Sequence, residues 1–306
     1  MVKRKIDSNP LWEKDKLTTF LCADDHLRAV LCHGSMMINE MKANHQLQIA
    51  ETLILGQNYL AASLLSSNLK EEDVIRLKIN CSGPLGGLNV EADFRHRVRG
   101  YLINNPIKQT EPGSMSMSDF FGAGILSFTR TNRLTNRPFT GQIELQYGNT
   151  ASDLAYYFTA SEQIATSFNL NISFNDSGNV TGAGGLLIQA LPGADEKLLM
   201  RTEEIVKNLP SIGDWYSKGG VSSEFILKYL APLNPRIISN THTQFFCDCA
   251  KERIQVHISS LSEEDKEDII NKNDFPIKTL CHNCGTSYIF SREESMELIK
   301  NKKNIQ

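Results

Sequence analysis

The 306-residue sequence lacks the long apolar segments of membrane proteins. No uninterrupted apolar run approaches the roughly 18 residues that a membrane-spanning helix needs. Residues 1–7 are basic and lead into charged sequence rather than into an apolar stretch, so no secretory signal peptide is expected. Without an export signal, the seven cysteines are expected to stay in the reducing cytoplasm, where disulfides are rare. We therefore expect a cytoplasmic protein with no membrane partner.

The sequence also lacks the short motifs of common enzyme classes. Neither G-x-S-x-G nor H-E-x-x-H occurs, so the serine-hydrolase and zinc-protease signatures are missing. The glycines of residues 83–87 match neither G-x-G-x-x-G nor G-K-[ST], the loops that cradle phosphates. One S-x-x-K match begins at Ser67, but neither S-D-N nor K-T-G accompanies it. We predict that the protein is not an enzyme.

An excess of either charge is missing too. The net charge is −3 and the isoelectric point is near 6.2, which gives no general attraction to nucleic acid or to anionic membranes. The basic run at residues 95–99 continues a strand pattern and is interpreted as a solvated sheet face. Acidic residues crowd the stretch 263–268, which weighs further against nucleic acid.

What the sequence does have is two tight cysteine motifs near its C-terminal end. A C-x-x-C pair lets two thiolates of one turn reach the same metal ion. A C-x-C pair in extended chain does the same, because residues i and i+2 point to one face. Four thiolates close a tetrahedral zinc site completely. We predict one Zn²⁺ ion with four ligands, namely Cys247, Cys249, Cys281 and Cys284.

Other groups near the motifs have lesser predicted roles. Three histidines are spare nitrogen donors that a four-cysteine site does not need: His242, His257 and His282. Three cations close in sequence are expected to lower the pKa values of the thiols: Lys251, Arg253 and Lys278. The other cysteines lie among apolar residues and are interpreted as buried thiols: Cys22, Cys32 and Cys81.

Hydrophobic periodicity predicts an α+β core in the first 193 residues. Apolar residues at helical spacing predict one helix over 16–34 and a longer helical region over 35–69. Period-two alternation predicts a pair of strands over 74–79 and 88–94. Residues 104–122 are interpreted as an exposed connection. Further predicted elements are strands at 124–130 and 141–147, a helix from about residue 150, and a strand–turn–strand unit over 170–191.

Beyond residue 193 the composition changes. Amphipathic stretches at 198–209 and 225–230 predict helices that are too short to be stable alone in water. We interpret residues 194–241 as a metastable helical linker whose stability can depend on both of its neighbours. Residues 242–306 then form the zinc-binding unit, with helices starting near Ser262 and Ser291. This unit has few large apolar residues, so it is expected to need its metal to fold.

Taken together, these motifs resemble one family, the redox-regulated 33 kDa chaperonins, which are heat-shock holdases. The resemblance covers most of the chain, and the combination of C-x-C with C-x-x-C is its most specific part. One departure is Ala250, where the family usually has serine, and this position is not a ligand. The stretches that carry the resemblance are residues 83–87, 98–101, 153–158, 161–163, 184–189, 246–249 and 281–284, with Glu252, Arg253, Tyr288 and Phe290.

The resemblance implies an N-terminal α+β domain, a helical linker and a C-terminal zinc domain. It implies that the reduced, zinc-bound protein is inactive. Oxidation would form the disulfides Cys247–Cys249 and Cys281–Cys284, release zinc, and unfold the zinc domain and the linker. The exposed surface would then hold unfolding client proteins without ATP, and a homodimer would accompany activation.

Two other functions stay open at this stage. The zinc unit could be a permanently reduced ribbon that contacts nucleic acid or protein. Alternatively, Cys281 and Cys284 could serve a thiol oxidoreductase, although no βαβ thioredoxin pattern surrounds them.

Overall fold

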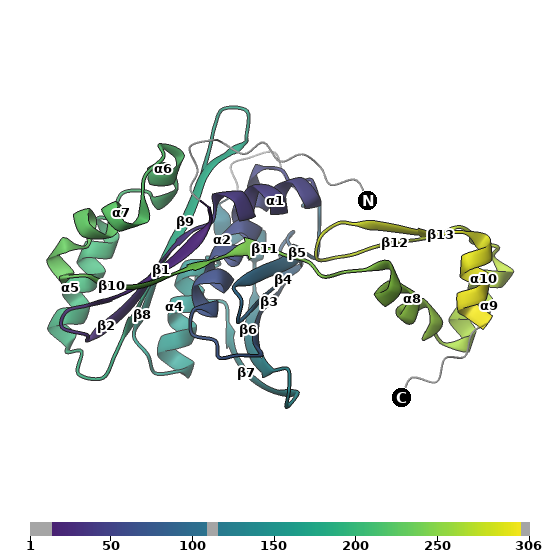
Figure 1. The fold of residues 1–306 in the computed structure, drawn as a ribbon, viewed down its shortest axis with the longest axis horizontal. Helices are drawn as coiled ribbons and strands as arrows, with labels where there is room; N and C mark the ends of the chain where they lie inside the picture. The colour runs from purple at the N-terminus through teal and green to yellow at the C-terminus, as the bar shows by residue number, and fades with distance from the viewer. Residues whose placement is uncertain (1–13, 109–115, 301–306) are drawn as a thin grey trace. The chain divides into compact units, whose positions relative to one another are not determined.

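The computed structural model describes residues 14–108 and 116–300 (Figure 1). The chain separates into two compact units, with the division between Phe246 and Cys247. The basic N-terminal residues 1–7 and part of the expected connection, residues 109–115, lie outside the described residues. Within the described part, no helix is long and apolar enough to cross a membrane.

The first unit contains a five-stranded antiparallel sheet with the strand order β10-β1-β2-β9-β8. Its central strands are buried on both faces, as in β2, where all but one residue are buried. The strands are β1 (Lys16–Cys22), β2 (Leu27–His33), β8 (Thr166–Phe174), β9 (Val180–Ala190) and β10 (Arg236–His242).

A second sheet of six strands has the order β11-β5-β4-β3-β6-β7. Along β3, Ile75, Leu77 and Ile79 are buried while Arg76 and Lys78 are exposed, so one face is apolar and the other solvated. Only β11 runs parallel to its neighbour. The strands are β3 (Asp73–Cys81), β4 (Gly87–Asp93), β5 (Arg97–Leu102), β6 (Gly124–Asn132), β7 (Arg137–Glu144) and β11 (Gln244–Phe245).

Helix α2 (Ile49–Ser66) contacts strands of both sheets and lies between them (Figure 1). It is buried on nearly all sides, as expected of a helix that is apolar all round. Helix α1 (Ser35–His45) precedes it, and α4 (Thr150–Ser161) packs on β8. The expected helical region over 35–69 is thus two helices, and the helix expected from residue 150 is confirmed.

The prediction of a helix over 16–34 is wrong, because these residues form the β1–β2 hairpin. Residues 23–25 have positive φ angles of 52°, 51° and 69° and make the turn. Both faces of the sheet are covered at β1 and β2, so buried residues occupy both sides of these two strands and the alternation of a half-exposed strand is lost. The apolar residues of β1 and β2 also happen to match the spacing of one face of a helix.

The other predicted strands are present, with shifted ends: the stretch 141–147 corresponds to β7, which ends at Glu144. The connection over 104–122 is not uniformly exposed. Its described second half contains α3 (Met117–Phe121), which buries Phe120 and Phe121. The α+β fold class is confirmed.

Three helices after residue 193 cover one face of the five-stranded sheet (Figure 1). They are α5 (Glu196–Lys207), α6 (Ile212–Ser217) and α7 (Ser222–Tyr229). Tyr216, Phe225 and Ile226 are almost fully buried in a cluster with sheet residues such as Phe20 and Leu27. Beyond them, η1 (Ala231–Leu233) leads into β10, a strand that the hydrophobic pattern did not predict.

The second unit is small and has few buried apolar side chains. Among its described residues, the large buried apolar side chains are Ile258, Phe290 and Ile299, beside Cys281 and Cys284. Its elements are α8 (Lys251–Ser259), α9 (Glu263–Asn271), β12 (Ile277–Leu280), β13 (Ser287–Phe290) and α10 (Arg292–Lys300). Helix α8 was not predicted from the sequence.

Candidate metal centre

The two cysteine motifs come from different local structures. Cys247 and Cys249 lie in a non-helical segment that runs into α8. Cys281 and Cys284 lie in the turn that joins β12 to β13. In this turn the Cys281 N–H donates to the Thr286 carbonyl (2.9 Å), and the Gly285 N–H donates to the Cys281 carbonyl (2.8 Å). Gly285 has a φ of 66°, which glycine adopts without strain.

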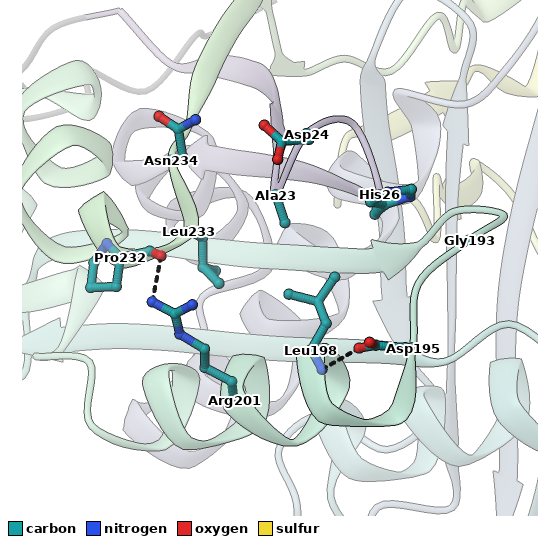
Figure 2. Close-up of a pocket in the computed structure, with 10 residues that line it drawn as sticks. All are labelled: Ala23, Asp24, His26, Gly193, Asp195, Leu198, Arg201, Pro232, Leu233 and Asn234. Carbon is teal, nitrogen blue, oxygen red and sulfur yellow. Dashed lines mark hydrogen bonds between the residues drawn. The ribbon is translucent and has the colours of Figure 1, made fainter.

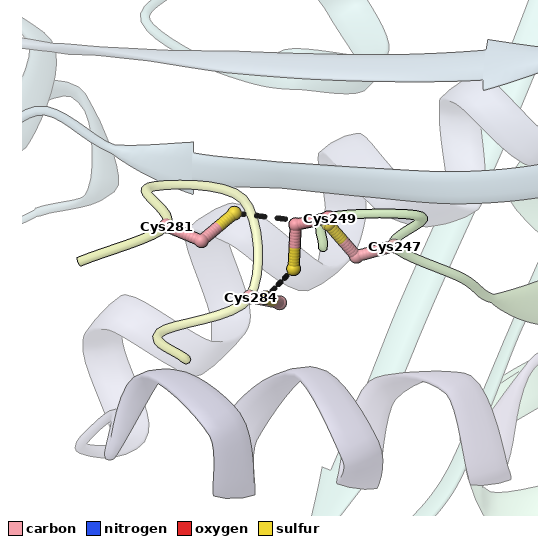
Figure 3. A group of neighbouring side chains, drawn as sticks. All are labelled: Cys247, Cys249, Cys281 and Cys284. Carbon is pink, nitrogen blue, oxygen red and sulfur yellow. Dashed lines mark hydrogen bonds between the residues drawn. The ribbon is translucent and has the colours of Figure 1, made fainter. Parts of the chain in front are cut away.

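The fold brings all four sulfur atoms together (Figure 3). Every Sγ lies within 4.8 Å of the other three. The Cys247–Cys281 sulfurs are 3.8 Å apart and the Cys249–Cys284 sulfurs 3.3 Å. Four Zn–S bonds of about 2.3 Å in a tetrahedron would place the sulfurs about 3.8 Å apart. A disulfide needs about 2.05 Å, and all four cysteines are free thiols.

The donor set suits a soft or borderline metal ion. Four thiolates are the ligands of closed structural zinc sites. Among the described residues, the converging group contains no histidine. His242 lies in β10, where its Nδ1 is 2.8 Å from the Asp15 carbonyl oxygen, and His257 lies in α8. The residues therefore fit one metal ion held by sulfur alone.

Two hydroxyl groups contact the sulfurs, and sequence reasoning assigned neither of them a role at the centre. The Tyr288 hydroxyl donates a hydrogen bond to Cys249 Sγ at 3.1 Å. Thr286 Oγ1 lies 3.1 Å from Cys284 Sγ and is hydrogen bonded to it. Both residues lie just after the C-x-x-C motif, and this proximity was the only sequence signal that could have suggested them.

Hydrogen bonds among the sulfurs separate the pKa values of the C-x-x-C pair. Bonds to Cys247 and Cys281, with a contribution from Thr286, lower the pKa of Cys284 to about 3. Bonds to Cys247 and Cys284 raise the pKa of Cys281. Burial, followed by the bond to Cys249, raises the pKa of Tyr288, so its phenol stays protonated and remains a donor.

Two of the three nearby cations, Lys251 and Arg253, are paired with carboxylates. Lys251 Nζ lies 2.5 Å from Glu294 Oε1, and Arg253 Nη1 lies 2.7 Å from Asp248 Oδ2. The lowered pKa of Cys284 therefore arises from hydrogen bonds rather than from the cations that the sequence suggested.

A separate cavity of about 380 Å³ lies in the first unit, where the β1–β2 turn meets α5 and η1 (Figure 2). Its polar groups serve the local structure. Asp195 accepts a bond from the Leu198 N–H (2.8 Å) and caps α5, and Arg201 Nη2 donates to the Pro232 carbonyl (2.8 Å). The cavity thus lies where the Arg201 hydrogen bond joins α5 to η1.

Comparisons with known proteins agree over nearly the whole chain. A family model described as Hsp33 protein matches residues 15–291. A 33 kDa chaperonin of Lachnoclostridium phytofermentans is 32% identical over 288 residues, 93% of this chain and 98% of the relative. One from Lactococcus lactis subsp. lactis is 30% identical over 289 residues, 94% and 100% of the two chains. The crystal structure of the Thermotoga maritima 33 kDa chaperonin gives a TM-score of 0.83 at 26% identity, covering 94% of this chain and 98% of that one.

Proposed function

This chain belongs to the Hsp33 family of 33 kDa chaperonins, and from that premise we propose that it is a redox-regulated holdase. The family is not enzymatic, and as a chaperonin the protein binds client proteins. In our proposal it is inactive while reduced and zinc-bound, and it becomes active when an oxidant breaks the cysteine centre. The observation that carries this proposal is the convergence of four sulfurs within 4.8 Å in a unit with little core of its own.

Cys247, Cys249, Cys281 and Cys284 would hold one Zn²⁺ ion, which would crosslink the two motifs. Four thiolates and one dication carry a formal charge of −2, which keeps the sulfurs nucleophilic toward oxidants. Among the described residues of the second unit, three large apolar side chains are buried, so a crosslink worth on the order of 10 kcal/mol would dominate its stability.

Oxidation by a peroxide removes the ligands. One thiolate attacks a peroxide oxygen, the O–O bond breaks, and the departing hydroxide takes up a proton to give water. The second thiolate of the motif attacks the resulting sulfenic acid sulfur, and a second water leaves as the disulfide forms. Each disulfide thus uses one peroxide, two protons and two electrons from the sulfurs. Disulfide sulfurs do not hold zinc, so the metal's contribution to folding is lost.

The three linker helices would differ in how easily they detach from the first unit after the metal is lost. In α5 only Thr202 and Val206 are buried, whereas α6 and α7 bury Tyr216, Phe225 and Ile226 in the core cluster. A 12-residue amphipathic helix is marginal in water without packing, so α5 is the part that loosens most easily. Its departure would uncover apolar side chains of the first sheet, and these would bind unfolding clients.

The proposed domain organisation follows the composition changes along the chain. We divide the chain into the core at 1–193, the linker at 194–241 and the redox-switch domain at 242–306. The covalent path from the linker to Cys247 runs through β10 and β11, and the Phe246 N–H donates to the Val98 carbonyl (3.0 Å) just before the motif. A homodimer on activation and a cytoplasmic location complete the proposal.

Aggregation of a heat-unfolding test enzyme, followed by light scattering, tests the proposed function. Reduced protein is expected to leave aggregation unchanged, and peroxide-treated protein is expected to suppress it. Equal suppression by both forms would contradict the redox switch and would favour a constitutive zinc unit. Salt-sensitive binding to DNA or RNA by the reduced protein would favour the nucleic-acid alternative.

A further inference from the structure

Tyr288 lies on the strand that follows the C-x-x-C motif, and its side chain contacts a cysteine of the C-x-C motif. It lies on β13, opposite Thr279 of β12, and its hydroxyl donates to Cys249 Sγ at 3.1 Å. The residue is partly buried, so its bond to Cys249 is partly sheltered from water. One hydrogen bond therefore joins the C-terminal hairpin to the C-x-C segment independently of any metal.

The sulfur that Tyr288 contacts belongs to the more exposed motif. Cys281 and Cys284 are buried, at 9% and 7% exposure, whereas Cys247 and Cys249 are more exposed. The buried motif has its own hydroxyl, because Thr286 Oγ1 lies 3.1 Å from Cys284 Sγ. The phenol thus contacts a sulfur of the more exposed of the two motifs.

A hydrogen bond donated to a thiolate draws electron density from the sulfur. Such outer neighbours orient metal ligands and tune them, and their loss typically lowers metal affinity 10–100-fold. A sulfur with less electron density is also a weaker nucleophile toward peroxide. Both effects act in the same direction, because both preserve the reduced centre.

We propose that Tyr288 is a positioning residue that holds Cys249 in the centre and lowers its reactivity, and so sets the oxidant dose at which the centre breaks. This inference rests on the proposed function. The step that Tyr288 slows is the attack of the Cys249 thiolate on a peroxide oxygen. In that step the O–O bond breaks, the leaving hydroxide takes a proton to form water, and Cys249 becomes a sulfenic acid. Cys247 then displaces a second water to close the disulfide.

The test uses the full-length, reduced, zinc-loaded protein and its Tyr288→Phe variant, which keeps the ring and removes the hydroxyl. Zinc release under excess peroxide is followed with a colorimetric chelator. The variant is expected to release zinc roughly fivefold faster, as the loss of one ordinary hydrogen bond implies. Its zinc affinity, measured by chelator competition without oxidant, is expected to fall about tenfold. Tyr156→Phe, the same change at a tyrosine on α4, is the matched control and is expected to match the wild type.

A spectroscopic measurement separates tuning from a merely structural role. In the Co²⁺-substituted protein, loss of the donor is expected to move the thiolate-to-cobalt charge-transfer band of Tyr288→Phe to lower energy. Replacing Tyr288 by 3-fluorotyrosine keeps the fold and strengthens the donor, so zinc release is expected to become slower than in the wild type. This second variant keeps the test decisive even where Tyr288→Phe folds poorly.

The outcomes separate this inference from the proposed function. If the wild type releases no zinc with peroxide, the proposed redox switch fails. If the wild type releases zinc but the phenylalanine and fluorotyrosine variants share its rate and its cobalt spectrum, the switch stands and the role of Tyr288 is overturned.

Discussion

Cys249 Sγ lies 3.3 Å from Cys284 Sγ, which is a contact between the two cysteine motifs rather than within one of them. The Cys247–Cys281 contact at 3.8 Å has the same character. Both contacts are those of ligands around one centre, in which each motif supplies half of the donors. Pairing within each motif therefore requires the sulfurs to leave this arrangement.

Tryptic mapping of peroxide-treated protein distinguishes the two pairings. Cleavage after Arg236, Lys251, Lys278 and Arg292 places each motif in its own peptide, 237–251 and 279–292. Disulfides within the motifs are expected to give two separate peptides, each lighter by two hydrogens. A crosslinked 237–251/279–292 species as the main product would show that the nearest sulfurs of the reduced centre pair instead. Reduced protein, alkylated before digestion, is the control.

Loss of one ligand is expected to unfold the second unit. Cys281→Ser should weaken zinc binding by more than about a hundredfold, since even the outer neighbours of a ligand cost 10–100-fold. Zinc content and the circular dichroism of the purified variant measure both effects. Cys81→Ser, at a partly exposed cysteine of the first unit, is the matched control and is expected to retain zinc. Full zinc content in Cys281→Ser would contradict the ligand assignment.

The bond from Arg201 Nη2 to the Pro232 carbonyl is expected to hold α5 in place. Arg201→Ala removes it and should lower the free energy of local unfolding of α5 by about 1 kcal/mol. Hydrogen exchange of the α5 amides, followed by mass spectrometry, should then become about fivefold faster. Lys197→Ala changes an exposed residue of the same helix and should leave exchange nearly unchanged. Equal exchange in the two variants would show that this bond does not anchor the helix.

Asp15 is expected to make the stability of the first unit depend on pH. Its buried carboxylate accepts bonds from the Met36 and Met37 N–H groups (3.1 and 2.6 Å), and burial raises its pKa from the ordinary value of 3.8 to about 7. The folded state thus keeps a proton that the unfolded state loses, so the contribution of Asp15 to stability is largest below about pH 4 and falls as the pH rises toward 7. The total contribution is on the order of 4 kcal/mol.

Denaturant unfolding at several pH values between 4 and 8 measures this contribution. The slope of the free energy of unfolding against pH should be less negative in Asp15→Asn than in the wild type, because the substitution removes a contribution that falls as the pH rises. Asp176→Asn, in an exposed turn, should keep the wild-type slope. An unchanged slope in Asp15→Asn would exclude Asp15 as the group responsible.

The cysteine centre could be predicted from the sequence because both motifs are local and their residue types have few other uses. The contact between Tyr288 and Cys249 could not, since it depends on how the β12–β13 hairpin meets a segment much earlier in the chain. Strand β10 was missed for another reason. Most of its side chains are exposed at the sheet edge, so it carries no apolar alternation.

At the β1–β2 hairpin, hydrophobic periodicity led to the wrong prediction of a helix. Leu17, Phe20 and Leu27 are buried from both sides of a covered sheet, and their spacing also matches one face of a helix. The turn at 23–25 has no glycine or proline, and its only turn-favouring residues are Asp24 and Asp25, a weaker signal that also fits the polar face of a helix. Helices α5 and α7 of the linker were predictable as amphipathic elements, but α6 and the sheet face that the three helices cover were not.

The most direct test of the central claim follows zinc release and client protection in one sample. Reduced, zinc-loaded protein is treated with peroxide, and aliquots taken over time are assayed for released zinc and for suppression of the aggregation of a heat-unfolding enzyme. If breaking the four-sulfur centre activates the chaperone, protection should be absent at the start and should rise with released zinc to about one ion per chain. Full protection before any zinc is released, or complete release without protection, would contradict the account.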